Sequence, residues 1–225
     1  MLVYVESLMG FGALETLTGI GLATSAGLNA YIPLLMIGLL GRFTNLIELP
    51  GAWQWLENDW VLGILAVLLA IEVVADKIPI VDHINDAIQT VIRPTAGGLA
   101  FGAATSSQTV TVSDPADFFS NNQWVPIVAG IAISFIVHSV KAAARPVVNA
   151  STAGVGAPVA STAEDVFSVV MSFIAIIFPF LIIFFLIFLI WIFFSLGRRR
   201  RRRRAEKEEL EALRRAAREA SPERR

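Results

Sequence analysis

Residues 166–196 form a run of 31 residues without a charged side chain, and seven consecutive arginines follow it at 198–204. A helix of that length would reach about 46 Å, whereas the hydrocarbon core of a bilayer is ~30 Å thick. Such a segment has to be buried in a membrane. We expect it to tilt, to extend beyond the bilayer, or to kink at Pro179.

The composition of the whole chain agrees with a membrane protein. Hydrophobic residues make up 55% of the 225 residues and charged residues 16%, which argues against an ordinary soluble enzyme and against a disordered chain. The absence of cysteine excludes disulfides, cysteine-ligated metal centres and thiol nucleophiles. The sequence also contains no phosphate-binding loop, dinucleotide fingerprint or metalloprotease motif. We therefore favour a non-enzymatic function.

Apolar segments predict an all-α, polytopic helical membrane domain over residues 1–197, followed by a basic, partly helical tail at 198–225. The six predicted spans are residues 17–40, 60–77, 95–112, 124–141, 147–160 and 166–196. The first span is interrupted by glycines and Pro33. The third and fifth are only weakly apolar, so we expect the other spans to enclose them.

Charge is divided unequally between the two parts. Residues 1–197 contain five basic and 13 acidic side chains, and the tail contains 13 basic and six acidic ones. Cytoplasmic loops are enriched in Lys and Arg. A chain with six spans in a bacterial inner (cell) membrane is therefore predicted to have both termini in the cytoplasm. The arginines at 198–204 would bind anionic lipid. Nucleic-acid binding is not predicted, because the basic run lacks interleaved aromatic residues.

Two short patterns recur and indicate tandem helical hairpins, or else chance among the small residues common in membrane helices. The first is a run of small residues at 25–30, 95–100 and 152–157. The second is a Trp-Val pair that precedes a lysine by 17 residues, at Trp60 and Trp124.

The densest group of charged residues lies at 72–93, where the second predicted span ends. Glu72 and Asp76 are four residues apart and share a helix face, and Lys77 follows them. A carboxylate just inside the bilayer edge costs on the order of 2–3 kcal/mol unless it is paired, neutralised or open to water. We therefore predict that these three residues form a charged gate on a substrate or ion pathway.

Pro79 should end that helix, and residues 82–92 are predicted to form a second, amphipathic helix. One interpretation is an interfacial helix whose neighbouring Arg93 reaches the lipid headgroups. The other uses Asp82 and Asp86, whose spacing suits two oxygen ligands of Mg²⁺ and, through it, a lipid phosphate. Mg²⁺ is the only cofactor that the sequence suggests, and no second aspartate-rich motif completes such a site.

Further polar residues fall inside the predicted spans. His138 is a candidate proton-relay group, or else a packed, hydrogen-bonded histidine. The interrupted first span predicts discontinuous helices that line a site through Ser25 and Asn29, or a simple packing kink. The remaining candidates are Asn149 as a third polar contact of the pathway, and Arg93, Lys141 and Arg145 as contacts of a headgroup or phosphate.

Four strings of residues resemble a known family: SAGLNAY at 25–31, LLGRF at 39–43, EVVADKIPIVD at 72–82 and IRPTAG at 92–97. Over residues 15–195 the chain resembles the bacterial membrane family catalogued as domain of unknown function 4126. The resemblance implies a multi-span membrane domain and makes the 72–93 cluster a family signature. It carries no established activity.

Three functions stay open at this point. The leading hypothesis is a small integral membrane transporter or channel, proton- or ion-coupled, for a small solute. The first alternative is a divalent-metal-dependent enzyme or flippase that acts on a lipid phosphate. The second is a non-catalytic membrane scaffold that works through the tail. A homo-oligomer would fit all three, because so few spans enclose little volume.

Overall fold

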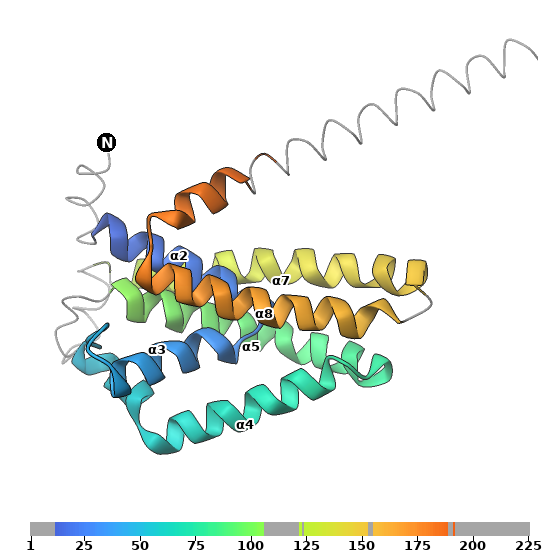
Figure 1. The fold of residues 1–225 in the computed structure, drawn as a ribbon, viewed down its shortest axis with the longest axis horizontal. Coiled ribbons are helices and arrows are strands. Elements are labelled where there is room, and N and C mark those ends of the chain that lie inside the picture. The colour runs from blue at the N-terminus through green and yellow to red at the C-terminus, as the bar shows by residue number, and fades with distance from the viewer. Residues whose placement is uncertain (1–11, 106–121, 123, 153–154, 189–190, 192–225) are drawn as a thin grey trace, which may run out of the picture. The chain divides into compact units, whose positions relative to one another are not determined.

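The computed structural model describes residues 12–105, 122, 124–152, 155–188 and 191, with side chains for all of them except 79–84 and 149. Every described element is helical, which confirms the all-α fold class. The helices are α2 (Ala13–Leu28), α3 (Tyr31–Phe43), the 3₁₀ helix η1 (Gly51–Glu57), α4 (Asp59–Ala75), α5 (Pro79–Thr105), α7 (Trp124–Thr152) and α8 (Gly156–Ile177) (Figure 1).

The chain divides into two compact units, residues 1–182 and 183–225. The named helices all belong to the first unit. In the second unit the structure describes a helical stretch at 183–188 and Trp191, whose ring stacks on Phe188 with centroids 6.2 Å apart. The arginine run at 198–204 and the rest of the tail lie outside the described residues, so their predicted contact with anionic lipid stays a prediction.

Two described helices, α7 and α8, are long and apolar enough to cross a membrane. The pair formed by η1 and α4 is bent by 60° and would be a third if it acts as one span. The side chains support a lipid environment. Apolar residues along α4 point outward, with Trp60, Ile64, Val67, Ile71 and Val74 each more than half exposed. Five charged residues, by contrast, are buried inside the unit, which is unusual for a soluble protein; they are Glu72, Asp76, Arg93, Lys141 and Arg145.

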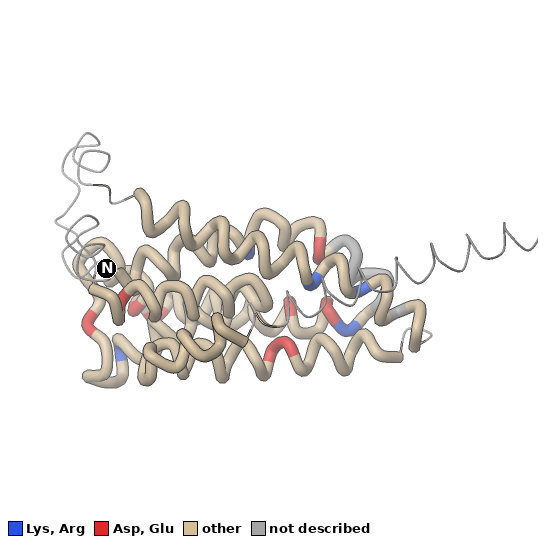
Figure 2. The backbone as a smooth tube through the Cα atoms, turned by 90° about the horizontal axis from the view of Figure 1, so that it is seen from above, with Lys and Arg blue, Asp and Glu red and all other residues tan. Residues whose placement is uncertain are grey.

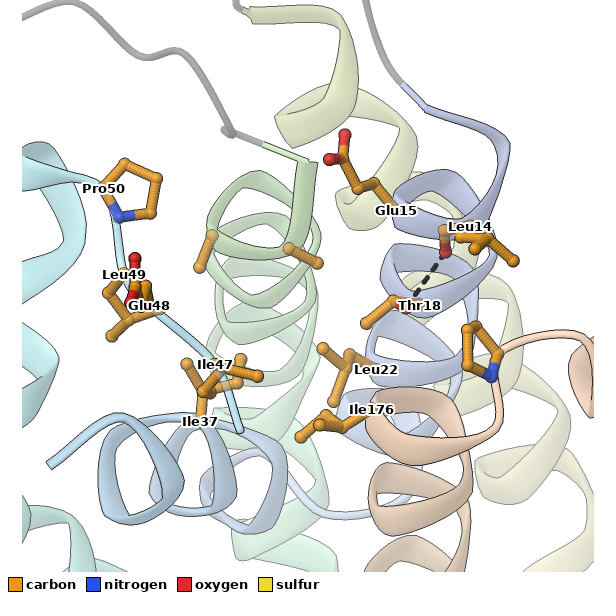
Figure 3. A pocket seen from close by; sticks show the side chains of 13 residues that line it. Leu14, Glu15, Thr18, Leu22, Ile37, Ile47, Glu48, Leu49, Pro50 and Ile176 are labelled. Carbon is orange, nitrogen blue, oxygen red and sulfur yellow. Dashed lines mark hydrogen bonds between the residues drawn. The ribbon is translucent and has the colours of Figure 1, made fainter. Parts of the chain in front are cut away.

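The first predicted span, 17–40, does not cross the bundle. The helix breaks at Asn29 and Ala30, and α3 runs back toward the end from which α2 came (Figure 1). Leu14 at the start of α2 and Ile37 near the end of α3 accordingly line the same cavity, with residues from the ends of α5 and α8 (Figure 3). The predicted discontinuity is therefore present, but it reverses the chain instead of kinking a single span.

Two predicted helix boundaries are wrong. The expected interfacial helix at 82–92 and the third span form one helix, α5, which continues through Pro94. The fourth span likewise continues through Pro146 to the end of α7, so residues 147–152 do not begin a new span. A proline inside a helix removes one backbone hydrogen bond but does not have to end the helix when tertiary contacts hold both halves.

The long apolar segment is interrupted near Pro179, which is one of the three arrangements expected from the sequence. Helix α8 begins at Gly156, ten residues before the predicted sixth span, and ends at Ile177. The chain then turns at Pro179, and a helix resumes at residues 181–188. The 31-residue run is thus not one straight helix.

Glycines allow α2, α5 and α7 to pack closely. A Cβ added at Gly98 of α5 would lie 2.8 Å from Ile131 of α7, and one at Gly130 of α7 would overlap the carbonyl of Gly97. Close approach of backbones through small residues is the usual means by which membrane helices associate. The C-terminal half of α5 is enclosed, as expected for the weakly apolar third span. In the fifth predicted span, by contrast, the described side chains at 147 and 150–152 are exposed, whereas 155–160 are partly buried, with Ala157 fully so.

The recurring sequence motifs do not occupy equivalent places. The small-residue run at 25–30 contains the break between α2 and α3, the one at 95–100 lies within α5, and the one at 152–157 connects α7 to α8. The two Trp-Val pairs are equivalent, since each opens a helix, α4 at Trp60 and α7 at Trp124. The tandem helical hairpins stay a prediction.

We expect Gly130→Ala to lower the melting temperature of the purified protein. The added methyl group must displace the α5 backbone, and overpacking of this kind costs about 1–3 kcal/mol. Gly63→Ala in α4 is the matched control, because a Cβ there meets nothing within 4 Å. In a helix that exchange should stabilise the protein by roughly 0.5–1 kcal/mol. Equal melting temperatures for the two variants would show that α5 and α7 do not pack in this way.

Candidate functional site: a buried ion network

Seven charged residues from four helices form what we call the ion network. Its members are Glu72, Asp76, Asp86, Arg93, Lys141, Arg145 and Glu164. Figure 2 shows the charged residues of the bundle in two groups, one of both signs toward one end and one mainly acidic toward the other. The ion network belongs to the first group. It brings together most of the residues that the sequence proposed as a gate or as headgroup contacts.

Asp76, the residue that follows α4, is the centre of the network. Its Oδ2 lies 3.1 Å from the Lys141 Nζ, 3.2 Å from the Arg145 Nη2 and 3.6 Å from the Arg93 Nη2. Its Oδ1 accepts a hydrogen bond from the Asn85 amide at 2.6 Å. The carboxylate is 2% exposed. One buried anion thus contacts three cations from two neighbouring helices.

Glu72 and Arg93 form the most deeply buried pair. Arg93 donates from Nη2 and Nε to the Glu72 Oε1, at 2.8 and 3.3 Å. Arg93 is 0% exposed and Glu72 1%. The Glu72 Oε2 is also buried, and among the described residues it has no hydrogen-bond donor. Arg93 therefore lies inside the protein rather than at a membrane surface, because its whole guanidinium is occupied by internal partners.

His138 of α7 also contacts the Arg93 guanidinium. Arginine can only donate, so the 3.2 Å contact between the Arg93 Nη1 and the His138 Nδ1 assigns Nδ1 as the acceptor. The Thr90 hydroxyl donates to the Asp86 carbonyl, so at 3.1 Å it accepts from the His138 Nε2. These contacts assign a neutral imidazole with its proton on Nε2. In this arrangement His138 positions Arg93, and the predicted proton relay remains untested.

Lys141 joins the network to the broken helix. Its ammonium contacts the Asp76 Oδ2, the Glu164 Oε2 at 2.9 Å, and the carbonyl of Leu28 at 3.1 Å. That carbonyl belongs to the C-terminal residue of α2, where a helix leaves carbonyls without intrahelical donors. A cation there also complements the negative end of the helix dipole. The charge of Lys141 is thus balanced by two carboxylates and a helix end.

Asn29 satisfies the other side of the break. Its Oδ1 accepts from the backbone N–H groups of Tyr31 and Ile32, at 3.1 and 3.2 Å, and so caps the start of α3. Its amide donates to the Asp165 Oδ1 at 3.0 Å. Lys77 lies 3.7 Å from the Asp165 Oδ2 and is the most exposed cation of this region. Asn29 and Lys77 therefore meet through Asp165, beside the ion network.

Ser25 lies one turn before the break, in a group that we call the serine cluster. The Ser25 hydroxyl is 2.6 Å from that of Ser168 and 2.7 Å from that of Ser172, both on α8. All three side chains are fully buried. Because hydroxyls both donate and accept, this cluster can reverse its hydrogen bonds without moving its helices.

Sequence reasoning missed Glu164, Asp165 and the two serines of α8. A signal was present, since Glu164 and Asp165 are the only acidic residues between Asp117 and Glu206. The residues at 165, 168 and 172 also have the spacing of one helix face. The predicted spans at 147–160 and 166–196 leave residues 161–165 between them, whereas these residues lie inside α8.

The predicted magnesium site at Asp82 and Asp86 stays a prediction, because one of its two carboxylates is not described. Asp86 lies 3.7 Å from the Arg145 Nη1, so its nearest charged partner is a guanidinium. The side chains of Asp82 and Asn149 lie outside the described residues. Among those residues that are described, no group of three or more His, Asp or Glu side chains could hold a metal ion. Lys141 and Arg145, predicted as headgroup or phosphate contacts, pair with carboxylates of the chain itself.

The four sequence strings given above and the ion network lie within a region that matches a known family. The family model described as a domain of unknown function, DUF4126, matches residues 16–199. The chain belongs to the DUF4126 family. The match includes α3 to α8 and all but the first three residues of α2, and therefore the whole ion network of this DUF4126 domain. Neither a curated protein nor a solved structure matches the chain.

We expect the Glu72–Arg93 pair to show strong coupling in unfolding experiments. Removing one partner leaves a buried, uncompensated charge, so Arg93→Met or Glu72→Leu alone should lower the unfolding free energy by about 3–5 kcal/mol. The double variant should lose much less than the sum, since no lone charge remains. Detergent-solubilised protein and a chemical denaturant provide the measurement.

The exposed pair Arg42–Asp59 is the matched control. Its atoms are as close, at 2.7 Å, but its side chains are 39% and 71% exposed. Arg42→Gln and Asp59→Asn should each change stability by roughly 0–1 kcal/mol. Additive losses at Glu72 and Arg93 would contradict the buried pairing.

Proposed function

We propose that this protein is a small membrane transporter or channel, proton- or ion-coupled, whose ion network forms part of the pathway. The proposal rests on one observation, which is that the break between α2 and α3 lies next to the ion network. The end of α2 and the start of α3 face Lys141 and Asp165 in the interior of the bundle. Irregular backbone at membrane depth is tolerated where it is buried in protein or lines a water-filled cavity, and in transporters such breaks bind substrates and coupling ions.

The charges of the network support proton or cation coupling. It contains four carboxylates and three cations. Buried oxygens of Glu72 (Oε2) and Asp86 (Oδ1) have no hydrogen-bond donor among the described residues. A buried carboxylate that lacks a full set of donors is stabilised by a proton or by a cation. We infer that the network alternates between a state that has bound a proton or a cation and a state that has not.

A line of polar groups supports a route along the contact between α2 and α8. The Asn29–Asp165 contact is followed, one turn away, by the serine cluster, and then by the Thr18 hydroxyl, which donates to the Ala175 carbonyl at 2.9 Å. The hydroxyls of the serine cluster are close enough to pass a proton from one to the next or to coordinate a small ion. The serines of α8 would therefore work with the ion network on the same pathway.

We further propose an orientation that differs from the expected one. The basic residues Lys77, Lys141 and Arg145 favour the cytoplasm for the end of the bundle that holds the turns between α4 and α5 and between α7 and α8. Helices α4, α5, α7 and α8 would cross the membrane. The α2–α3 hairpin would enter and leave on the external side. The N-terminal end of α2 would then be external rather than cytoplasmic.

Proton flux into vesicles tests the pathway. Proteoliposomes would contain the dye pyranine, and a potassium diffusion potential set by valinomycin would drive proton entry. We expect the wild-type protein to acidify the interior faster than empty vesicles do. Glu72→Gln should lower the rate by roughly tenfold or more, because it removes a charge from the pathway while it keeps the Oε1 acceptor.

Asp59→Asn is the control for this flux, since it removes a carboxylate that is exposed and outside the network. It should acidify at the wild-type rate. If the wild-type protein acidifies no faster than empty vesicles, and exchanges no sodium or potassium either, the transporter proposal fails. Unchanged flux in Glu72→Gln would place the pathway elsewhere.

Single cysteines test the orientation, and the chain contains none of its own. Leu14→Cys and Asn45→Cys should react with a membrane-impermeant maleimide on intact cells, because both lie at the end proposed to be external. Ser151→Cys, in the exposed last turn of α7, should react only after the membrane is opened. If Leu14→Cys behaves like Ser151→Cys, the re-entrant hairpin is wrong and a first crossing is restored.

A further inference from the structure

Two buried oxygen atoms in and beside the ion network have no hydrogen-bond donor among the described residues. They are the Glu72 Oε2 of α4 and the Gln89 Oε1 of α5. The two residues are 1% and 2% exposed. Nearly all buried polar atoms in proteins have a partner, and one that lacks a partner calls for an explanation such as a bound ion or water. The two oxygens therefore point to a bound group at this place.

Tyr31 brings a third oxygen to the same place. It is the first residue of α3, directly after the helix break, and it is buried. Its phenol group forms a hydrogen bond with the Gln89 side chain and lies within electrostatic range of Glu72 and Arg93. Oxygen atoms from α3, α4 and α5 are therefore gathered where the broken helix resumes.

The charge of the ion network favours a cation as the bound group. Its described members are four carboxylates and three basic side chains, so negative charge is in excess by one. The contacts of His138 assign a neutral imidazole, which does not change this balance. An excess charge inside a membrane protein is costly unless a counter-ion compensates it. One monovalent cation cancels the excess, whereas a divalent ion would reverse its sign.

The three oxygens have the chemistry of ligands for an alkali cation. Carboxylate, carbonyl and hydroxyl oxygens are hard ligands, and hard cations prefer them to nitrogen and sulfur. One of the three oxygens is charged and two are neutral, which suits a single positive charge. Sodium is favoured over potassium, because the three side chains are buried between packed helices and the smaller ion needs less space.

We propose that the Glu72 Oε2, the Gln89 Oε1 and the Tyr31 hydroxyl bind one sodium ion. The Glu72 carboxylate then has a fixed cation, Arg93, on Oε1 and an exchangeable cation on Oε2. The proposal rests on the proposed transport function in that it makes sodium the coupled ion, but binding at equilibrium is measured without flux. Sodium binding without any flux would retain this site and remove the transporter. Proton flux without sodium binding would do the reverse.

The test is thermal unfolding of the full chain in detergent, at constant pH and ionic strength, in the chloride salts of sodium, potassium and N-methylglucamine. A ligand that binds only the folded state raises the melting temperature as its concentration increases. We expect sodium to raise the melting temperature above that in N-methylglucamine. Potassium should need a concentration about tenfold higher, or more, for the same shift.

Three variants locate the ion. Gln89→Met and Tyr31→Phe each remove one oxygen and keep the charge of the network, and each should raise the sodium concentration needed for a given shift by about tenfold or more. Glu72→Gln removes the excess charge and should abolish the sodium shift. A role in packing alone would lower the melting temperature equally in every salt. Gln54→Met is the matched control, because the Gln54 side chain is exposed, and it should respond to sodium as the wild-type protein does.

Three results would overturn the proposal. The first is an equal melting temperature in the three salts, which would mean that the Gln89 amide group donates to the Glu72 carboxylate without an ion. The second is a melting temperature that responds to pH and not to sodium, which would assign the compensating charge to a proton. The third is a sodium shift of wild-type size in all three variants, since the ion would then bind elsewhere.

Discussion

The carboxylate of Asp76 connects helices of the bundle that are far apart in the sequence. It follows α4, and its three cationic partners come from α5 and α7. Through Lys141 it also reaches Glu164 of α8 and the last carbonyl of α2. Each buried ion costs several kcal/mol to remove from water, and that cost is recovered only where the geometry of every pair is good. Any arrangement that separates members of the network is therefore penalised, because it leaves buried charges without partners.

The broken helix depends on the same network. A helix that ends inside a bundle leaves carbonyl and N–H groups without partners, and hydrocarbon offers none. Lys141 satisfies the α2 end and Asn29 the α3 end, while Asn29 is held in turn by Asp165. The hairpin of α2 and α3 can thus stop halfway along its neighbours. Glycine contacts on α2 place it close enough to α7 for the Lys141 ammonium to reach the Leu28 carbonyl.

The sequence predicted which charged residues form the site better than it predicted where the helices begin and end. Glu72, Asp76, Arg93, His138, Lys141 and Arg145 could be selected because a charge in an apolar segment is costly and requires a partner. Which partner each one meets could not be predicted, because ion pairs between α4, α5, α7 and α8 depend on contacts far apart in the chain. The predicted boundaries at 92–95, 141–147 and 160–166 are wrong, because α5 continues through Pro94, α7 through Pro146 and α8 through Glu164 and Asp165. In these cases tertiary contacts outweighed a local preference.

The two ends of the bundle differ in chemistry, and α2 is the element between them. One end has a cavity with acidic lining, and the other has a nearly balanced set of buried ions. Leu22, which is 1% exposed, closes the floor of the cavity, and the hydroxyls of the serine cluster lie beyond it. The hydroxyl contacts of Ser25 with Ser168 and Ser172, and the close approach of Gly21 to Ala175, form part of the contact between α2 and α8. Since α2 stops inside the bundle and is held there by Lys141, a change in the charge of the network would act directly on the helix that separates it from the cavity.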